Sequence, residues 1–168
     1  DESHALLIGA THASVTGNAD NNVLTGNGGN NDITGGLGHD ILTGSVGMDH
    51  FLLNDPHDSQ LIAIGTGYDW IRDWEIGTDR IISPWRREIQ QASLVGSVSD
   101  LQAGAIAQLL NTSTFSVDVI AAAFTFGSTD GTHTFLALNN NRSGFDASED
   151  CLLEITGYRG ELGLPAGT

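Results

Sequence analysis

The chain has 168 residues, of which 21 are acidic and only 6 are basic, so its formal net charge is −15. A chain without a positive footprint is a poor partner for nucleic acid and for anionic membrane surfaces. Repulsion among so many carboxylates destabilises a compact state unless cations neutralise it, and divalent metal ions are the obvious neutralisers. The hydrophobic fraction of 39% is enough for a modest core.

Cysteine and hydropathy exclude further classes of protein. Cys151 is the single cysteine, so the chain can form neither an internal disulfide nor a thiolate metal site. No apolar run approaches the length of a membrane span, which predicts that the chain does not insert into a membrane. The chain lacks an initiator Met and is therefore interpreted as a fragment or a mature piece of a longer protein.

Nine-residue repeats are the strongest signal in the sequence. Four consecutive rows begin with glycine and cover residues 17–25, 26–34, 35–43 and 44–52. Their sixth residues all carry a side-chain oxygen: Asn22, Asn31, Asp40 and Asp49. Their eighth residues are all large and apolar: Leu24, Ile33, Leu42 and Phe51. A degenerate fifth row, residues 8–16, keeps only its apolar eighth residue and its final Thr.

Each conserved column of the repeat has a physical role. Glycine lets two backbones approach closely, as a loop of carbonyls around a cation requires. The sixth-position oxygen is a hard ligand that suits Ca²⁺. The eighth side chain cannot be buried by one row alone, so the rows must stack. The alternative is a solvent-exposed Gly/Asn linker, but a linker would not keep a bulky apolar residue at every ninth position.

The rows resemble the GGxGxDxUx repeats of RTX, or haemolysin-type, calcium-binding proteins. Residues 35–43 match every defined position, and residues 44–52 depart only at Ser45, where the pattern has glycine. The resemblance implies an all-β fold: a parallel β-roll followed by a β-rich C-terminal capping region with one short helix. It places consecutive rows on opposite sides of the roll, with Ca²⁺ between rows two apart.

The resemblance also implies two sets of calcium ligands. In the first, backbone carbonyls join the side chains of Asn22 and Asp40; those carbonyls belong to Asn18, Asp20, Gly35 and Leu37, and the turn includes Gly36 and Gly38. In the second, carbonyls join the side chains of Asn31 and Asp49; those carbonyls belong to Asn27, Gly29, Gly44 and Val46. Asn at position six attracts a cation less than Asp does, so both sites are expected to be weaker than an all-Asp pair.

The segment 68–81 alternates apolar and polar residues around a turn at Gly77 and predicts two strands. It is similar to the DxIxDFxxGxDxI segment that follows RTX repeats, with Trp74 in place of Phe. That likeness implies that Asp69 and Asp73 complete the last metal sites, while Asp79 is expected to be a turn residue. The alternative is that these are surface carboxylates on the polar face of a hairpin.

The domain division predicted is a calcium-binding β-roll over 1–58 and a cap and secretion region over 59–168.

The rest of the chain is expected to be mainly strands. Asp100 is predicted to cap a short helix that ends near Asn111, and strands are predicted over 115–120, 123–126, 134–138 and 151–156. The stretch 134–158 resembles the C-terminal module of large cyanobacterial RTX-type surface proteins, sometimes called the bluetail domain.

Catalytic motifs are not evident in the sequence. It has no HExxH helix, no GxSxG elbow and no P-loop, so an enzyme is not predicted. Cys151 starts a predicted strand and is interpreted as core packing. His39 and His50 lie beside Asp40 and Asp49 in variable repeat columns, and solvent-facing positions are favoured over a mixed His/Asp transition-metal site.

The sequence therefore predicts a calcium-triggered folding and secretion module at the C-terminus of an exported or cell-surface protein, with Ca²⁺ as its cofactor. The family resemblance implies type I secretion machinery or cell-surface components as partners and an extracellular location. One alternative is the non-catalytic tail of a secreted hydrolase, such as a metalloprotease or lipase. Another is an adhesin or surface-layer unit whose tail binds glycan or copies of itself.

Overall fold

The computed structural model describes residues 3–62 and 67–163. Short strands dominate these ranges, together with one α-helix and one 3-10 turn. In chain order the elements are β1 (Ser3–Leu6), β2 (Ala13–Thr16), β3 (Asn22–Thr25), β4 (Asn31–Thr34), β5 (Ile41–Thr43), β6 (His50–Leu52), η1 (Pro56–Asp58), β7 (Asp69–Ile71), β8 (Arg80–Ile82), β9 (Glu88–Ile89), β10 (Ser93–Val98), α1 (Ala103–Leu109), β11 (Ala121–Ser128), β12 (Gly131–Leu138) and β13 (Cys151–Glu154).

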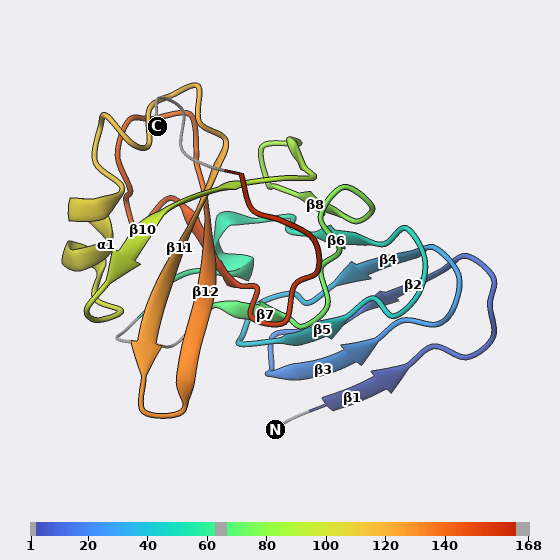
Figure 1. Ribbon diagram of the computed structural model, residues 1–168. Helices are drawn as coiled ribbons and strands as arrows, with labels where there is room; N and C mark the ends of the chain where they lie inside the picture. The colour runs from blue at the N-terminus through green and yellow to red at the C-terminus, as the bar shows by residue number, and fades with distance from the viewer. Residues whose placement is uncertain (1–2, 63–66, 164–168) are drawn as a thin grey trace.

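Two sheets organise these strands, and most neighbouring strands in them are parallel (Figure 1). The larger sheet has the order β1-β3-β5-β7-β13-β12-β11-β10, and the smaller has the order β2-β4-β6-β8-β9. Successive repeats therefore alternate between the sheets, and each strand pairs with the strand two rows away. The expectation of a β-rich fold with one short helix is confirmed.

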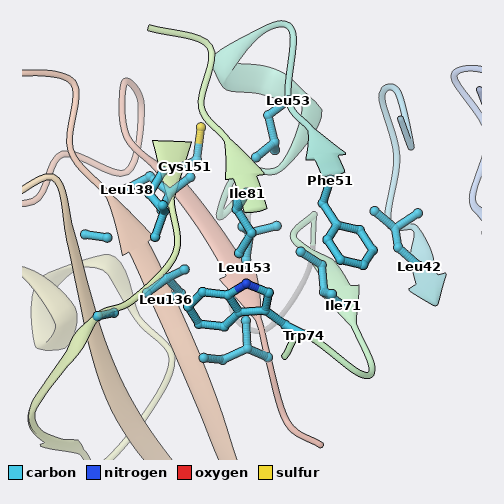
Figure 2. Packing of buried hydrophobic residues seen from close by; sticks show 14 of the residues in the cluster. Leu42, Phe51, Leu53, Ile71, Trp74, Ile81, Leu136, Leu138, Cys151 and Leu153 are labelled. Atoms are coloured by element: carbon cyan, nitrogen blue, oxygen red, sulfur yellow. The ribbon is translucent and has the colours of Figure 1, made fainter. Parts of the chain in front are cut away.

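Apolar side chains of the repeats fill the space between the sheets. The pairing Leu24↔Leu42 in one sheet and Ile33↔Phe51 in the other stacks the eighth positions of rows two apart. All four of these side chains are at most 3% exposed. Figure 2 shows how Leu42 and Phe51 continue into Ile71, Ile81 and Trp74. Since strand side chains alternate faces, one apolar residue in each three- or four-residue strand is enough to build this core.

The segment after the repeats differs from the hairpin suggested by its pattern. β7 and β8 both form, but β7 pairs with β5 in the larger sheet, and β8 pairs with β6 in the smaller one. Ile71 and Ile81 point inward and are fully buried, so each strand copies the role of a repeat. Because parallel pairing with the preceding rows buries more apolar surface than a lone hairpin could, the two strands separate into opposite sheets.

The larger sheet continues into the C-terminal region through β13, which pairs in parallel with β7 and antiparallel with β12. Leu153 faces the core between the sheets, whereas Leu152 faces a second core with Phe124, Phe135 and Ile106. This part of the sheet is covered on both faces, which explains why its strands read as nearly continuous apolar runs.

Two C-terminal elements differ from the sequence prediction. Residues 115–120 form successive turns instead of a strand; Phe115 is fully buried while Val117 is 46% exposed. The Phe115 N–H donates to Asn111 O at 2.8 Å and closes the turn before it. Burial of the Phe115 ring therefore outweighs the β propensity of the segment. The helix α1 begins after Gln102, not Asp100, although Asp100 Oδ1 accepts from Gln102 N at 3.0 Å. In the described ranges no helix is long and apolar enough to cross a membrane.

A pair of carboxylates holds His133 at the edge of this region. His133 Nδ1 lies 2.7 Å from Glu154 Oε1 and Nε2 lies 3.2 Å from Asp130 Oδ1. The hydrogen bond to Glu154, which is nearly buried, is the main reason that the pKa of His133 is raised above its usual range.

His133 should make the stability of the protein depend on pH near neutrality. A raised folded-state pKa means that this stabilisation is complete below the unfolded pKa and is lost as pH rises through the folded pKa. We expect the difference in unfolding free energy between wild type and His133→Gln to shrink as pH rises from about 6 to about 8. Urea denaturation at constant calcium measures it, and a difference that grows with pH would contradict this assignment.

Candidate metal centre

Two pairs of repeat turns bring the predicted ligand residues together. The turn 17–22 lies beside 35–40, because β3 pairs with β5 in the register Val23↔Ile41. The turn 26–31 lies beside 44–49, because β4 pairs with β6 in the register Asp32↔His50. We call these the first and the second turn pair. Each has one Asn and one Asp at its two sixth positions.

Hydrogen bonds connect the sixth positions into two ladders. In the first turn pair Asn22 N donates to Asp40 Oδ1 at 2.7 Å, and Asp40 N donates to Asp69 Oδ1 at 2.8 Å. In the second, Asn31 N donates to Asp49 Oδ1 at 2.8 Å. Asp40 and Asp49 therefore each use one oxygen to accept a backbone N–H from the row two before their own.

Asp79 continues the second ladder and is the residue that the sequence analysis missed. Asp49 N donates to Asp79 Oδ1 at 3.0 Å, and Asp79 is only 3% exposed. The assignment of Asp79 to a turn was incomplete, since Glu75 N also donates to its Oδ2 at 2.8 Å. The sequence did carry a signal for this role. Ile81 follows Asp79 by two residues, just as the buried Leu42 follows Asp40.

The second oxygens of Asp40 and Asp49 are buried without a partner. Asp40 Oδ2 and Asp49 Oδ2 accept no hydrogen bond from any described residue. A Cβ atom added to Gly35 would lie 2.3 Å from the first of them, and one added to Gly44 would lie 2.5 Å from the second. Burying a carboxylate oxygen without a partner costs folding free energy. A proton or a cation at each of these two oxygens would remove that cost.

Further oxygens converge beside these carboxylates. A Cβ atom on Gly17 would lie 2.0 Å from Asn22 Oδ1 and 2.2 Å from Gly35 O, so these two oxygens face the same small space. Gly26 stands in the same relation to Asn31 Oδ1 and Gly44 O, at 2.2 and 2.4 Å. Only glycine leaves room for oxygen atoms that close to the backbone.

Carbonyls of the upstream turns also lie close to the backbone of the downstream turns. A Cβ atom on Gly36 would lie 2.4 Å from Asn18 O, and one on Gly38 would lie 2.8 Å from Asp20 O. In the second turn pair the corresponding distance from Gly47 to Gly29 O is 2.5 Å. These carbonyls belong to residues predicted as ligands, and the close approach places them along the line where the two turns meet.

The side chains of three other predicted ligand residues do not point to a metal role of their own. Asn27 Nδ2 donates to Ile8 O at 3.3 Å and to Thr11 O at 3.2 Å, so its side-chain amide binds the turn of the degenerate row, residues 8–16. Leu37 and Val46 have exposed side chains, and a role for them would involve only the backbone.

Asp73 and Asp69 are fixed to the repeats and are not surface carboxylates on a hairpin. Both oxygens of Asp73 accept backbone N–H groups, from Gly44 and from Ser45, each at 2.8 Å. Asp69 is 2% exposed, and its own N–H donates to Ser59 Oγ at 2.8 Å. Both residues therefore order the last turns, whatever else they bind.

Burial makes the ladder carboxylates unusually weak acids. It raises the pKa of Asp40 and of Asp49 from the ordinary 3.8 to about 6. Burial, reinforced by the charge of Asp40, raises the pKa of Asp69 well above its usual range. Burial also raises the pKa of Asp79. A bound cation would offset this cost of burial and keep the groups ionised at neutral pH.

Histidines do not complete these sites. His39 was expected to face solvent, but it is half-buried, its Nδ1 bonds to Tyr68 O, and its ring meets the Tyr68 ring edge-on at 5.5 Å. His50 Nδ1 lies 3.0 Å from Asp32 Oδ1. Within residues 3–62 and 67–163, no three His, Cys, Asp or Glu side chains form a cluster that could hold a metal ion. Any cation in the turn pairs would thus depend mainly on carbonyl and amide oxygens, with few carboxylates.

No protein-family model matches the chain, and no curated protein matches it. The chemical interpretation of the turn pairs therefore rests on their own oxygen atoms, their burial and their spacing.

The pKa values of the ladder lead to a test in metal-free protein. Between 3.8 and about 6 the folded chain keeps protons on Asp40 and Asp49 that the unfolded chain has lost, so these groups lower stability as pH rises. Asp40→Asn removes one of them. We expect the unfolding free energy of this variant, relative to wild type, to increase across that window in chelator, with enough sucrose or TMAO present to keep the metal-free repeats folded.

Asp32→Asn is the matched control for this measurement, because Asp32 lies in the same repeats but its side chain is 36% exposed. Its difference from wild type should not show that increase. A constant difference for Asp40→Asn across the window would mean that Asp40 is not desolvated in the metal-free fold.

Proposed function

We propose that the N-terminal part of the chain is a parallel β-roll that binds Ca²⁺ at the two turn pairs and folds in response to it. The observation that carries this proposal is the pair of buried, unpartnered oxygens, Asp40 Oδ2 and Asp49 Oδ2. Each faces glycine backbone in a turn where carbonyl and amide oxygens also converge. The arrangement of two mostly parallel sheets joined by these turns supports the roll.

The donor set favours Ca²⁺ over other metal ions. Asp40, Asn22 and the neighbouring carbonyls offer oxygen only, which suits a hard cation and not a transition metal. Ca²⁺ accepts six to eight oxygens in irregular geometry, whereas Mg²⁺ demands a tight octahedron and gives up water reluctantly. Backbone carbonyls fixed along the line between two turns suit the larger and more tolerant ion.

Metal binding would supply folding free energy in this part of the chain. The repeats bury one apolar side chain per row, so they have little core to offset the entropy of ordering their glycine-rich turns. Cations that neutralise the ladder carboxylates add the missing stabilisation, and binding to the folded state alone shifts the equilibrium by mass action. Low calcium then favours the unfolded repeats, and high calcium favours the folded ones.

This calcium dependence fits an exported protein. We propose that the chain is a secretion and folding module that stays open in a low-calcium cytosol and folds outside the cell, where calcium is plentiful. Its partners would be calcium ions, a type I secretion machinery and components of the cell surface. The net charge of −15 is consistent with a module whose compact state needs cations.

Calcium affinity distinguishes ligand from surface carboxylates. Asp40→Asn and Asp49→Asn should each weaken Ca²⁺ binding at least about tenfold, because losing even groups that only orient metal ligands costs that much. Asp32→Asn should change affinity little. Calorimetric titration at fixed ionic strength measures all three. Equal losses in the three variants would reduce the effect to general charge and would overturn the proposed sites.

Calcium removal should unfold the repeats selectively. With chelator we expect the amide protons of Ile33 and Leu42 to lose their protection from exchange, while those of Phe135 and Leu152 keep most of theirs. Calcium should restore protection, and Mg²⁺ at the same concentration should not. Unchanged protection at Ile33 and Leu42 after chelation would show that apolar stacking alone holds the roll.

A further inference from the structure

A polar groove with a volume of about 390 Å³ opens in the C-terminal region and shares no residue with the turn pairs. It lies between the turn that joins β8 to β9 and two loops that meet at the start of β13. The residues that line it include His57, Trp85, Asn140, Arg142, Ser148 and Glu149. The volume falls within the range of about 300–1,000 Å³ that is usual for small-ligand sites.

Trp85 forms the aromatic wall of the groove. Its ring is half-buried and packs against the main core, so it is fixed in place while part of it remains accessible. The turn that carries it is closed by Arg86 N, which donates to Ser83 O, and by Ser83 N, which donates to Arg87 O, both at 2.9 Å. A rigid, partly exposed indole on a tight turn can contact a ligand at little entropic cost.

Planar polar groups also line the groove. Glu149 Oε2 accepts from Asn140 Nδ2 at 3.0 Å and pairs with Arg142 Nη1. The side chains of Arg142 and Glu149 are 72% and 43% exposed, so both keep atoms available to a ligand. His57 lines the same groove. Its Nδ1 lies 2.5 Å from Asp55 Oδ1, which leaves Nε2 for another partner.

Both polar loops are anchored before any ligand arrives. Asp150 is fully buried; its Oδ1 accepts from Asn140 N at 2.9 Å and its Oδ2 accepts from Asp146 N at 2.8 Å. The His57 loop forms the 3-10 turn η1, whose capping box joins Asp55 to Asp58. Ser59 O then accepts from Leu152 N at 3.0 Å, which attaches this loop to β13. The groove is thus preorganised by the sheet.

Two turns beside the groove hold a residue other than glycine at positive φ. Among the described residues, only three that are not glycine have positive φ angles: Ser45 in the second turn pair, Arg86 at 57° and Asn141 at 73°. Arg86 follows Trp85 directly, and Asn141 separates Asn140 from Arg142. Glycine would relieve the strain at Arg86 without loss of the turn. Strain of this kind tends to persist where it orients functional side chains.

We propose that this groove binds a saccharide. Its walls offer donors on Arg142 and Asn140, acceptors on Glu149 and His57, and one aromatic face, a combination that suits a ring with many hydroxyl groups and an apolar C–H face. The paired charges of Arg142 and Glu149 cancel, so a neutral sugar fits better than a strongly charged ligand. Trp85 stacks on the C–H face of the sugar, and the planar side chains bond to its hydroxyls.

The test uses the whole chain in calcium on an array of neutral hexoses, N-acetylhexosamines, uronic acids and their short oligomers. The sugar with the highest signal is then titrated by calorimetry up to about 10 mM. We expect saturable binding that Trp85→Ala weakens at least about tenfold, as for an aromatic anchor at the centre of a site. Glu149→Gln should weaken it also, and Trp85→Phe should retain part of the affinity.

Controls separate a lost contact from a lost fold. Trp70→Phe changes a tryptophan of the repeat sheet, and Glu161→Gln changes an exposed carboxylate outside the groove. Both should bind sugar like wild type, and all variants should bind calcium like wild type. No binding to any sugar on the array, or full affinity in both Trp85→Ala and Glu149→Gln, would overturn the proposal. Neither result would bear on the calcium sites, which share no residue with the groove.

Discussion

The structure depends on one repeated hydrogen bond, in which the backbone N–H of a sixth-position residue donates to the carboxylate of the sixth position two rows later. This bond sets the register of the parallel strands, because it joins side chain to backbone where each strand begins. It also buries the carboxylate, since the next row covers it. Asp40 and Asp49 thereby hold the rows together with one oxygen and present the other to the turn.

The same residues therefore link stacking to charge. A carboxylate that must be buried to align the strands weakens the fold unless a proton or a cation neutralises it, and burial raises the pKa of Asp40 and Asp49 to about 6 in response. On the proposed function, protons and metal ions would compete for one oxygen on each residue. A neutral amide oxygen could accept the same N–H without this sensitivity, so it is the choice of Asp that makes the stability of the repeats depend on pH.

The sequence predicted the parts of the fold that repeat. The eighth-position column identified Leu24, Ile33, Leu42 and Phe51 as core, because a nine-residue period leaves few other ways to bury them. It did not predict what depends on distant packing. The burial of Phe115 in a turn and the separation of β7 from β8 are decided by surfaces far away in the chain. Asp79 was missed because a glycine turn next to it offered a sufficient local explanation.

β13 lies between the repeats and the C-terminal strands, and it connects the two proposed sites. Its Leu153 side faces the core shared with the repeats, and its Leu152 side faces a second core in which Phe124 stacks on Phe135 at 5.5 Å. The second core contains no repeat residue, so it can hold β11, β12 and β13 together even if the repeats unfold. Two contacts attach the groove loops to the start of β13. Asp150, just before the strand, accepts from Asn140 N, and Ser59 O accepts from Leu152 N within it. Trp85, by contrast, packs against the core shared with the repeats, so the proposed saccharide site would keep its polar loops but lose its aromatic wall if the repeats unfolded without calcium, as proposed above.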